Sequence, residues 1–155
     1  MSRATVLLAS MLVLTACAQH ESGSPDEPVF EDSALGLRIA VPASWRGRYT
    51  TERDTLTGLP AQRVWLFQYH PRDTSIVPQT LMAIAVYDTA NWHRVAAEDG
   101  PPVGEVVRTV GGRVAVVGWP QSNPFPPGAD SATFDSLQFP HEQLARRLTL
   151  RMRAP

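Results

Sequence analysis

The stretch EVVRTVGGRVAVVGW, residues 105–119, decides the fold. Its two runs, 105–110 and 113–119, are rich in valine and flank the pair Gly111-Gly112. Two glycines between β-branched runs favour a tight hairpin, because glycine reaches the left-handed backbone angles that such a turn requires. The sequence therefore predicts a pair of antiparallel strands here.

Other strand signals precede this hairpin. Residues 61–70 have the strongest β-type composition in the chain, with Val, Trp, Leu, Phe and Tyr close together. Residues 81–87 form a nearly continuous apolar run, which is typical of a central strand buried on both faces. Residues 37–41 alternate and stop at Pro42, and residues 48–53 fit an exposed strand.

Two or three helices are expected, from three candidate segments. One spans residues 89–98, begins at a Thr89 or Asn91 cap, and stops at the Gly-Pro-Pro of 100–102. A short second helix starts at an Asp130 cap. A third has Pro140 in its first position and an apolar face formed by residues at four-residue spacing: Leu144, Leu148 and Met152. The fold class is therefore α+β, with a mainly antiparallel sheet of about five to seven strands and two or three packing helices.

The amino terminus carries an export signal. Arg3 precedes an apolar run of eleven residues, 4–14, which is too short to span a bilayer and typical of a signal-peptide core. Leu14-Thr15-Ala16-Cys17 follows at once and resembles the lipobox of bacterial lipoproteins. The resemblance implies cleavage between Ala16 and Cys17 and a diacylglyceryl group on the Cys17 sulfur. The alternative is a simple secretory signal, but Cys17 is the only cysteine in the chain, and lipidation gives an exported lone thiol a role.

This anchor predicts where the domain resides. Each buried methylene contributes about 0.8 kcal/mol, so two or three acyl chains hold a protein on a membrane durably, whereas one holds it only reversibly. Ala18 stands where an Asp would retain a lipoprotein at the inner membrane. The resemblance therefore implies the periplasmic face of the outer membrane.

The chain divides into three parts. Residues 1–16 form the signal peptide, residues 17–28 form the lipidated cysteine and a disordered tether, and residues 29–155 form one α+β domain. The tether sequence AQHESGSPDEP, residues 18–28, has no large apolar side chain to offset its ordering entropy. As a flexible coil, these residues span roughly 18 Å on average.

Composition excludes some partners. From residue 29 onward, 13 arginines face 12 acidic residues, and this balance lacks the basic excess of a nucleic-acid binder. The expected partners are the membrane, through the lipid anchor, and an envelope protein or glycan. No nucleic acid and no cofactor are expected, and the domain is expected to be a monomer.

The start of the domain has a further resemblance. Phe30 and GLRIAVPASW, residues 36–45, combine an aromatic residue, a glycine, an alternating strand, a proline and a tryptophan. This pattern is similar to the opening hairpin of PsbP-like domains. It implies the same α+β architecture and carries over no functional residue.

Catalytic and metal motifs are weak. His141-Glu142 begins like the zinc-protease motif HExxH, but Ala145 stands where the second imidazole must be. The other histidines, His20, His70 and His93, share no ligand spacing. A Ser-His-Asp site assembled only in three dimensions remains an alternative, because such sites are defined by geometry. Tryptophans 45, 65, 92 and 119 lie in apolar patterns, which favours core packing over carbohydrate stacking.

Two segments have both a structural and a functional interpretation. The loop PQSNPFPPG, residues 120–128, could bind a partner through Gln121, Asn123 and Phe125, or it could be a stiff connection with Phe125 in the core. The second segment is an arginine cluster, Arg146, Arg147, Arg151 and Arg153. It could contact an anionic surface, or it could complement the carboxyl end of a helix. We expect the structural alternative for both segments.

Two function classes follow. The sequence favours a lipid-anchored envelope protein with a non-catalytic binding or scaffolding domain. The alternative is a small envelope hydrolase with dispersed Ser, His and Asp residues. A histidine placed in a pocket within reach of both a carboxylate and a hydroxyl would support the hydrolase.

Overall fold

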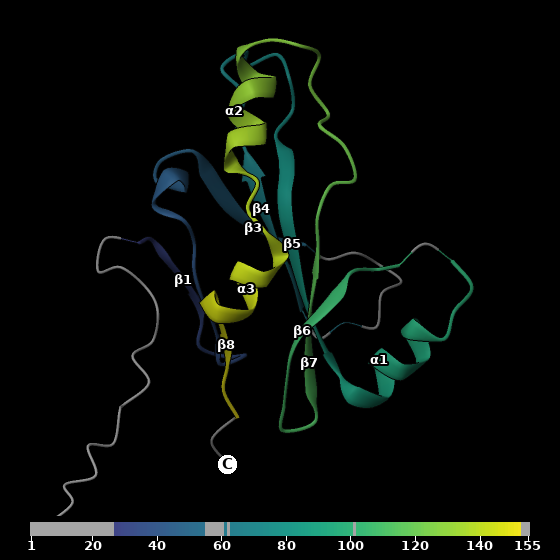
Figure 1. Ribbon diagram of the computed structural model, residues 1–155. Coiled ribbons are helices and arrows are strands. Elements are labelled where there is room, and N and C mark those ends of the chain that lie inside the picture. Colours follow the sequence, from purple (N-terminus) through teal and green to yellow (C-terminus); the bar gives the residue numbers. More distant parts are fainter. Residues whose placement is uncertain (1–26, 55–60, 62, 101, 153–155) are drawn as a thin grey trace, which may run out of the picture.

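The computed structural model describes residues 27–54, 61, 63–100 and 102–152 (Figure 1). The described part holds eight strands in two antiparallel sheets and three α-helices, which confirms the predicted α+β class. The strands are β1 (Val29–Asp32), β2 (Leu37–Ala40), β3 (Tyr49–Asp54), β4 (Arg63–Tyr69), β5 (Gln79–Asp88), β6 (Glu105–Val110), β7 (Arg113–Gly118) and β8 (Leu148–Leu150). The helices are α1 (Thr89–Ala96), α2 (Ala129–Leu137) and α3 (His141–Arg147), with a 3₁₀ turn η1 (Ala43–Trp45).

The predicted hairpin is confirmed. Gly111 and Gly112 have φ angles of 56° and 75°, and they join β6 to β7 in antiparallel pairing. Because both angles are left-handed, any residue with a Cβ would be strained in this turn. The hairpin forms one border of a five-stranded sheet with the order β3-β4-β5-β7-β6.

The predicted central strand is β5, and its two faces pack into two different cores. Ile84 and Val86 face the main core, whereas Ala85 and Tyr87 face a second cluster. Helix α1 covers that second cluster through buried Val95 and half-buried Trp92. The alternation of strand side chains thus explains why this run is apolar throughout.

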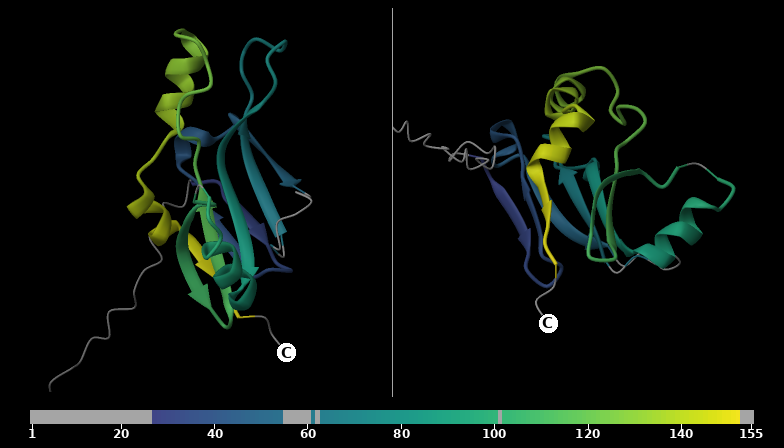
Figure 2. Two further views of the ribbon diagram at one scale, coloured as in Figure 1. Left: turned by 90° about the vertical axis from the view of Figure 1, so that its right-hand side faces the viewer. Right: turned by 60° about the horizontal axis from the view of Figure 1, so that its bottom comes forward.

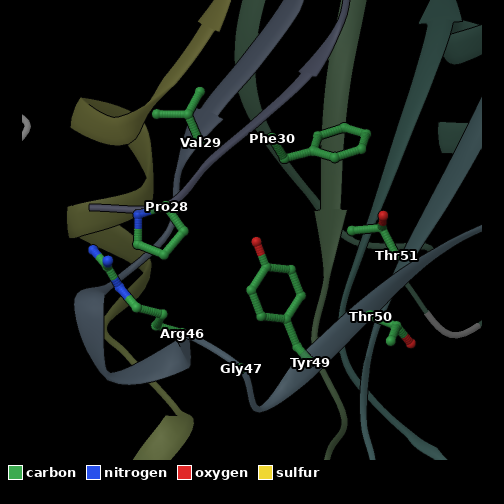
Figure 3. A pocket seen from close by; sticks show the side chains of 8 residues that line it. All are labelled: Pro28, Val29, Phe30, Arg46, Gly47, Tyr49, Thr50 and Thr51. Carbon is green, nitrogen blue, oxygen red and sulfur yellow. The ribbon is translucent and has the colours of Figure 1, made fainter. Parts of the chain in front are cut away.

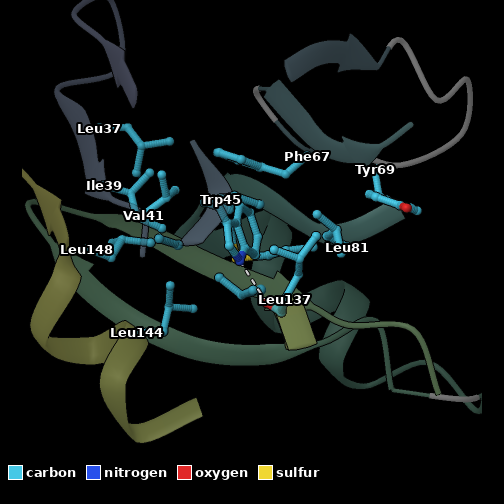
Figure 4. Close-up of a cluster of buried hydrophobic side chains, with 14 of the residues drawn as sticks. Leu37, Ile39, Val41, Trp45, Phe67, Tyr69, Leu81, Leu137, Leu144 and Leu148 are labelled. Atoms are coloured by element: carbon cyan, nitrogen blue, oxygen red, sulfur yellow. Dashed lines mark hydrogen bonds between the residues drawn. The ribbon is translucent and has the colours of Figure 1, made fainter. Parts of the chain in front are cut away.

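The main core lies between the five-stranded sheet and a layer made of the second sheet, α2 and α3 (Figure 2). The second sheet has the order β1-β2-β8. Trp45 is 1% exposed in this core, and its ring Nε1 donates to the carbonyl oxygen of Leu137 at 2.7 Å (Figure 4). This bond fixes η1 against the end of α2, and it confirms that Trp45 is a core residue.

The third predicted helix is wrong beyond Arg147. Residues Leu148–Leu150 form strand β8, in which Leu148 pairs with Ile39 and Leu150 pairs with Leu37. Both leucines of β8 are buried and Thr149 between them is half-buried, which is the period of a strand. The free edge of β2 therefore determines the conformation of this segment.

The predicted helix caps also need correction. Asp88, rather than Thr89 or Asn91, caps α1, because its Oδ1 accepts the Asn91 amide hydrogen bond at 2.8 Å. Gly128, rather than Asp130, occupies the cap position of α2. Pro140 precedes α3 as its cap residue instead of occupying its first turn.

The two sheets meet differently at their two pairs of edge strands. Strands β6 and β8 lie side by side, and we call this the closed border. Strands β1 and β3 are the other two edge strands, and we call their side of the molecule the open border. The candidate site lies at the open border.

Candidate binding groove at the open border

A groove of about 440 Å³ lies between the starts of β1 and β3 (Figure 3). Three consecutive residues of each edge region line it, together with two residues of the turn after η1. They are Pro28, Val29, Phe30, Arg46, Gly47, Tyr49, Thr50 and Thr51. The groove is shallow and open to solvent, and its lining is mostly apolar.

Aromatic rings form the base of this groove. Tyr49 stacks on Phe67 with ring centroids 5.8 Å apart, and Phe30 contacts Phe67 edge-on at 5.2 Å. The base therefore belongs to the main core and is rigid. Val29, in contrast, is 47% exposed at the rim.

The hydroxyl of Tyr49 points into the groove, toward Pro28 and Phe30 (Figure 3). Burial raises the pKa of Tyr49, so this hydroxyl is protonated at neutral pH. Among the described residues it makes no hydrogen bond, and it is thus available as a donor or acceptor for a bound group.

A second, smaller hollow of about 190 Å³ adjoins the groove at Gly47. Its lining consists of Gly47, Arg48, Tyr69, His70, Arg72 and Thr133, and we call it the arginine pocket. Gly47 has a φ of 68°, a backbone angle that favours glycine, and it lines both hollows. The groove and the arginine pocket thus share one wall.

Asp130 hydrogen-bonds to two residues that line the arginine pocket. Its Oδ1 accepts the Tyr69 hydroxyl at 2.6 Å and the Arg72 amide at 3.0 Å. These two bonds hold the pKa of Asp130 below its usual value, while burial and the bond to Asp130 raise the pKa of Tyr69. The bonds fix α2 against the end of β4, and they explain why Asp130 does not cap its helix.

The histidines do not complete a catalytic set among the described residues. His70 Nε2 lies 2.7 Å from Thr50 Oγ1, but no carboxylate contacts this imidazole. His141 Nδ1 lies 3.0 Å from Glu105 Oε2, and the imidazole ring stacks on Trp119 with ring centroids 3.7 Å apart. No hydroxyl of the described residues joins the pair of His141 and Glu105. His93 is exposed on α1, and His20 lies outside the described residues. The part of the chain that the structure describes also contains no cluster of metal-ligating side chains.

The pair of His141 and Glu105 lines a third hollow, of about 330 Å³, near the closed border. Trp119, Pro120 and Gln121 also line it, so Gln121 of the predicted binding loop faces a hollow after all. Both partners of the ion pair are solvent-exposed, with side-chain exposures of 50% for His141 and 63% for Glu105. Such a pair contributes little to stability.

The rest of the predicted loop is structural. Phe125 is 7% exposed and packs edge-on against Tyr69 at 5.6 Å and against Phe134 at 5.5 Å. Asn123 donates to Asp135 at 2.8 Å and accepts the Phe125 amide at 2.9 Å. These contacts agree with the expectation that the loop is a stiff connection with Phe125 in the core.

The predicted arginine cluster is dispersed. Arg147 pairs with Glu27 at 2.6 Å and is largely buried, whereas Arg146 and Arg151 are exposed on α3 and after β8. Arg146 and Arg147 lie in the last turn of α3, where they complement the negative end of the helix. Arg153 lies outside the described residues.

The lipobox also lies outside the described residues, and with it Ala16 and Cys17. The described chain begins at Glu27, where the pair with Arg147 and a bond from the Val41 amide to the Pro28 carbonyl join it to the domain. No helix of the described part has the length and apolarity needed to cross a bilayer.

Comparisons with protein-family models, with curated proteins and with solved structures find no match for this chain.

Sequence reasoning missed the groove and the arginine pocket. Their residues come from β1, β3, β4 and α2, and none of them forms a motif. The one local signal is Arg46-Gly47-Arg48, in which two arginines flank a glycine after a turn. A glycine that is needed for its backbone angle beside exposed polar groups is a common feature of binding surfaces.

Proposed function

We propose that this protein is a bacterial envelope lipoprotein, anchored through Cys17, whose domain is a non-catalytic binding module. The groove at the open border is the observation that carries the binding proposal. It combines a rigid aromatic base, a Tyr49 hydroxyl that makes no hydrogen bond to the described residues, and two exposed sheet edges. Ligand sites typically consist of an apolar surface with a few polar groups.

The position of the groove suits a protein held by its amino terminus. Pro28, the last residue of the predicted tether, and Val29, the first residue of the domain, both line the groove. The tether itself offers no large apolar side chain to fill an aromatic groove, so it is a poor occupant. A ligand from the surrounding envelope fits better.

Photo-crosslinking in living cells tests this function. A photoreactive phenylalanine analogue replaces Thr51 in the groove and, as a matched control, exposed Glu98 after α1. We expect light-dependent adducts from position 51 and none from position 98, identified by their added mass. Absence of any adduct at position 51 would contradict the binding proposal.

The anchor has a separate test. We expect Cys17→Ser to abolish incorporation of labelled fatty acid and to leave an uncleaved or mislocalised precursor. Cys17 is the only thiol, so residual acyl label on sulfur cannot arise from another site. Normal labelling and membrane partition in the variant would refute the lipoprotein proposal.

A further inference from the structure

Three contacts join the groove and the arginine pocket into one surface. Gly47 lines both hollows. Thr50 of the groove bonds to His70 of the pocket at 2.7 Å, and Tyr49 of the groove pairs directly with Tyr69 of the pocket across β3 and β4. A ligand that fills one hollow therefore lies within reach of the other.

The arginine pocket has the chemistry of an anion site. Arg48, Arg72 and His70 line it, and neither guanidinium makes an ion pair with a described residue. One carboxylate, Asp130, lies next to the lining residues Tyr69 and Arg72. Guanidinium groups favour phosphate and carboxylate oxygens, to which they donate in pairs.

Two carboxylates near this pocket already have partners. Asp130 Oδ1 accepts from the Tyr69 hydroxyl and the Arg72 amide. Asp73 Oδ1 accepts from the Ser75 amide at 2.9 Å and the Ser75 hydroxyl at 2.7 Å. Asp130 thus bonds to β4 and to the loop after it, and Asp73 bonds within its own loop. Neither carboxylate takes up a guanidinium donor, so these donors remain for an incoming anion.

The groove is mostly apolar, although Arg46, Thr50 and Thr51 also line it. Pro28, Val29 and Phe30 present apolar surface beside the ring of Tyr49. This surface suits a short apolar chain or ring, whose burial is favourable and non-directional.

We infer that the two hollows together bind an anionic amphiphile, with its phosphate or carboxylate in the arginine pocket and its apolar tail in the groove. The inference rests on the proposed binding function and names its ligand class. Charge complementarity places the head group, and the apolar lining places the tail. The tether leads into the groove at Pro28, so a lipid-anchored domain carries this surface near a membrane, where such amphiphiles occur.

Hexyl phosphate is the test probe, because it combines the two features and is soluble. The full-length lipidated protein is held in phosphatidylcholine nanodiscs, and empty nanodiscs correct for partition of the probe into lipid. Equilibrium dialysis then measures the binding of hexyl phosphate, hexanol and inorganic phosphate. We expect hexyl phosphate to bind about tenfold or more tightly than either control, and added salt to weaken it.

Variants assign the two ends of the ligand. Arg48→Gln with Arg72→Gln should weaken hexyl phosphate about tenfold or more, whereas the matched pair Arg53→Gln with Arg94→Gln, at exposed sites outside both hollows, should not. Val29→Asn should weaken hexyl phosphate but not inorganic phosphate, and Val77→Asn, which is 69% exposed elsewhere, should change neither. Unchanged unfolding midpoints show that each variant folds.

Each outcome decides between specific alternatives. If inorganic phosphate and hexyl phosphate bind with equal affinity, the groove does not bind the tail, and the proposal of an amphiphilic ligand is wrong. If Arg48→Gln with Arg72→Gln leaves the affinity for hexyl phosphate unchanged, the arginine pocket is not the site of the head group. A protein adduct at position 51, together with no binding of hexyl phosphate, would keep the binding function and refute this ligand class.

Discussion

The closed and open borders of this domain differ in what joins the two sheets. At the closed border, arginine side chains of β6 and β7 reach across to main-chain carbonyls. Arg113 donates to Leu35 and Arg151, and Arg108 donates to Ala145 and Leu148. At the open border, the strands separate toward Pro28, and the groove occupies the gap. The same pair of sheets is thus tied along one side and left accessible along the other.

One ionic junction limits how far the groove extends. Asp32 at the end of β1 accepts hydrogen bonds from Arg63 at 2.5 Å and from Trp65 at 2.9 Å, both on β4. We call these three residues the Asp32 junction. It joins the two sheets beyond the groove, so the open border is open only at its Pro28 end. The closed border and the Asp32 junction thus hold the two sheets together, and the accessible gap remains at the Pro28 end.

The largest expected effect is at this junction. Asp32→Ala leaves the mostly buried Arg63 charge without its partner, which typically costs about 3–5 kcal/mol of folding free energy. Chemical denaturation of the variant measures this loss. Glu31→Ala, at the exposed neighbouring position, is the control and should change stability by less than about 0.5 kcal/mol. A loss at Asp32 no larger than at Glu31 would show that the junction does not hold the sheets together.

The junction also predicts a dependence on pH. Burial alone would raise the pKa of Asp32, but the bonds from Arg63, Trp65 and the Leu35 amide outweigh it and hold the pKa below 3.8. A lowered pKa stabilises the fold above the unfolded-state value of about 3.9, and this contribution is lost as the pH falls through the folded-state pKa. The stability difference between the native protein and Asp32→Ala should therefore shrink below about pH 4.

Denaturation series at several pH values test this dependence. Asp73, Asp88 and Asp130 also have lowered pKa values, but they are present in both proteins and cancel in the difference. A difference that stays constant down to pH 2 would contradict the assigned role of Asp32.

The next effect lies on the closed border. Arg113 is 7% exposed, and Arg113→Ala leaves the carbonyl groups of Leu35 and Arg151 without this donor. We expect the free energy of unfolding to fall by about 3 kcal/mol, because hydrogen bonds from charged donors are stronger than those from neutral donors. Arg94→Ala on the surface of α1 is the matched control. If both variants unfold at the same denaturant concentration, the closed border is held by packing alone.

A smaller loss is expected from Arg108→Ala. This arginine is exposed, and its two carbonyl acceptors, on Ala145 and Leu148, are accessible to water once it is removed. We expect the variant to lose about 1 kcal/mol of folding free energy. Amide hydrogen exchange should become faster in β8, and it should change less in β4. Exchange that rises equally in both strands would show that β8 has no local stability of its own.

The sequence predicted the local parts of this fold well. The glycine pair between valine runs gave the hairpin, and the continuous apolar run gave the central strand, because both signals lie within a few residues. The division into two sheets has no such signal. Leu37 pairs with Leu150, more than a hundred residues away, and the four-residue spacing of Leu144 and Leu148 fits a helix as well as it fits the helix-to-strand boundary found here.

The site was harder to predict for the same reason. Gln121 was expected to bind and does line a hollow, but Phe125 belongs to the core. In the sequence, the groove residues have the pattern of ordinary strand residues, and Asp32 resembles a residue of the turn before Gly36. Their proximity depends on how two sheets pack, which a single sequence does not encode in any short pattern.

The smallest expected effect is the sharpest test of the open border. Tyr49→Phe removes a hydroxyl that makes no hydrogen bond among the described residues, while the ring keeps its contacts with Phe67 and Trp45. We expect unfolding free energy to change by less than about 0.5 kcal/mol. In the same variant, affinity for hexyl phosphate should stay within about twofold, because the saturated tail that occupies the groove has no atom that hydrogen-bonds to this hydroxyl. A large stability loss would instead mean that this hydroxyl has a structural partner, and the open border would then be a part of the core.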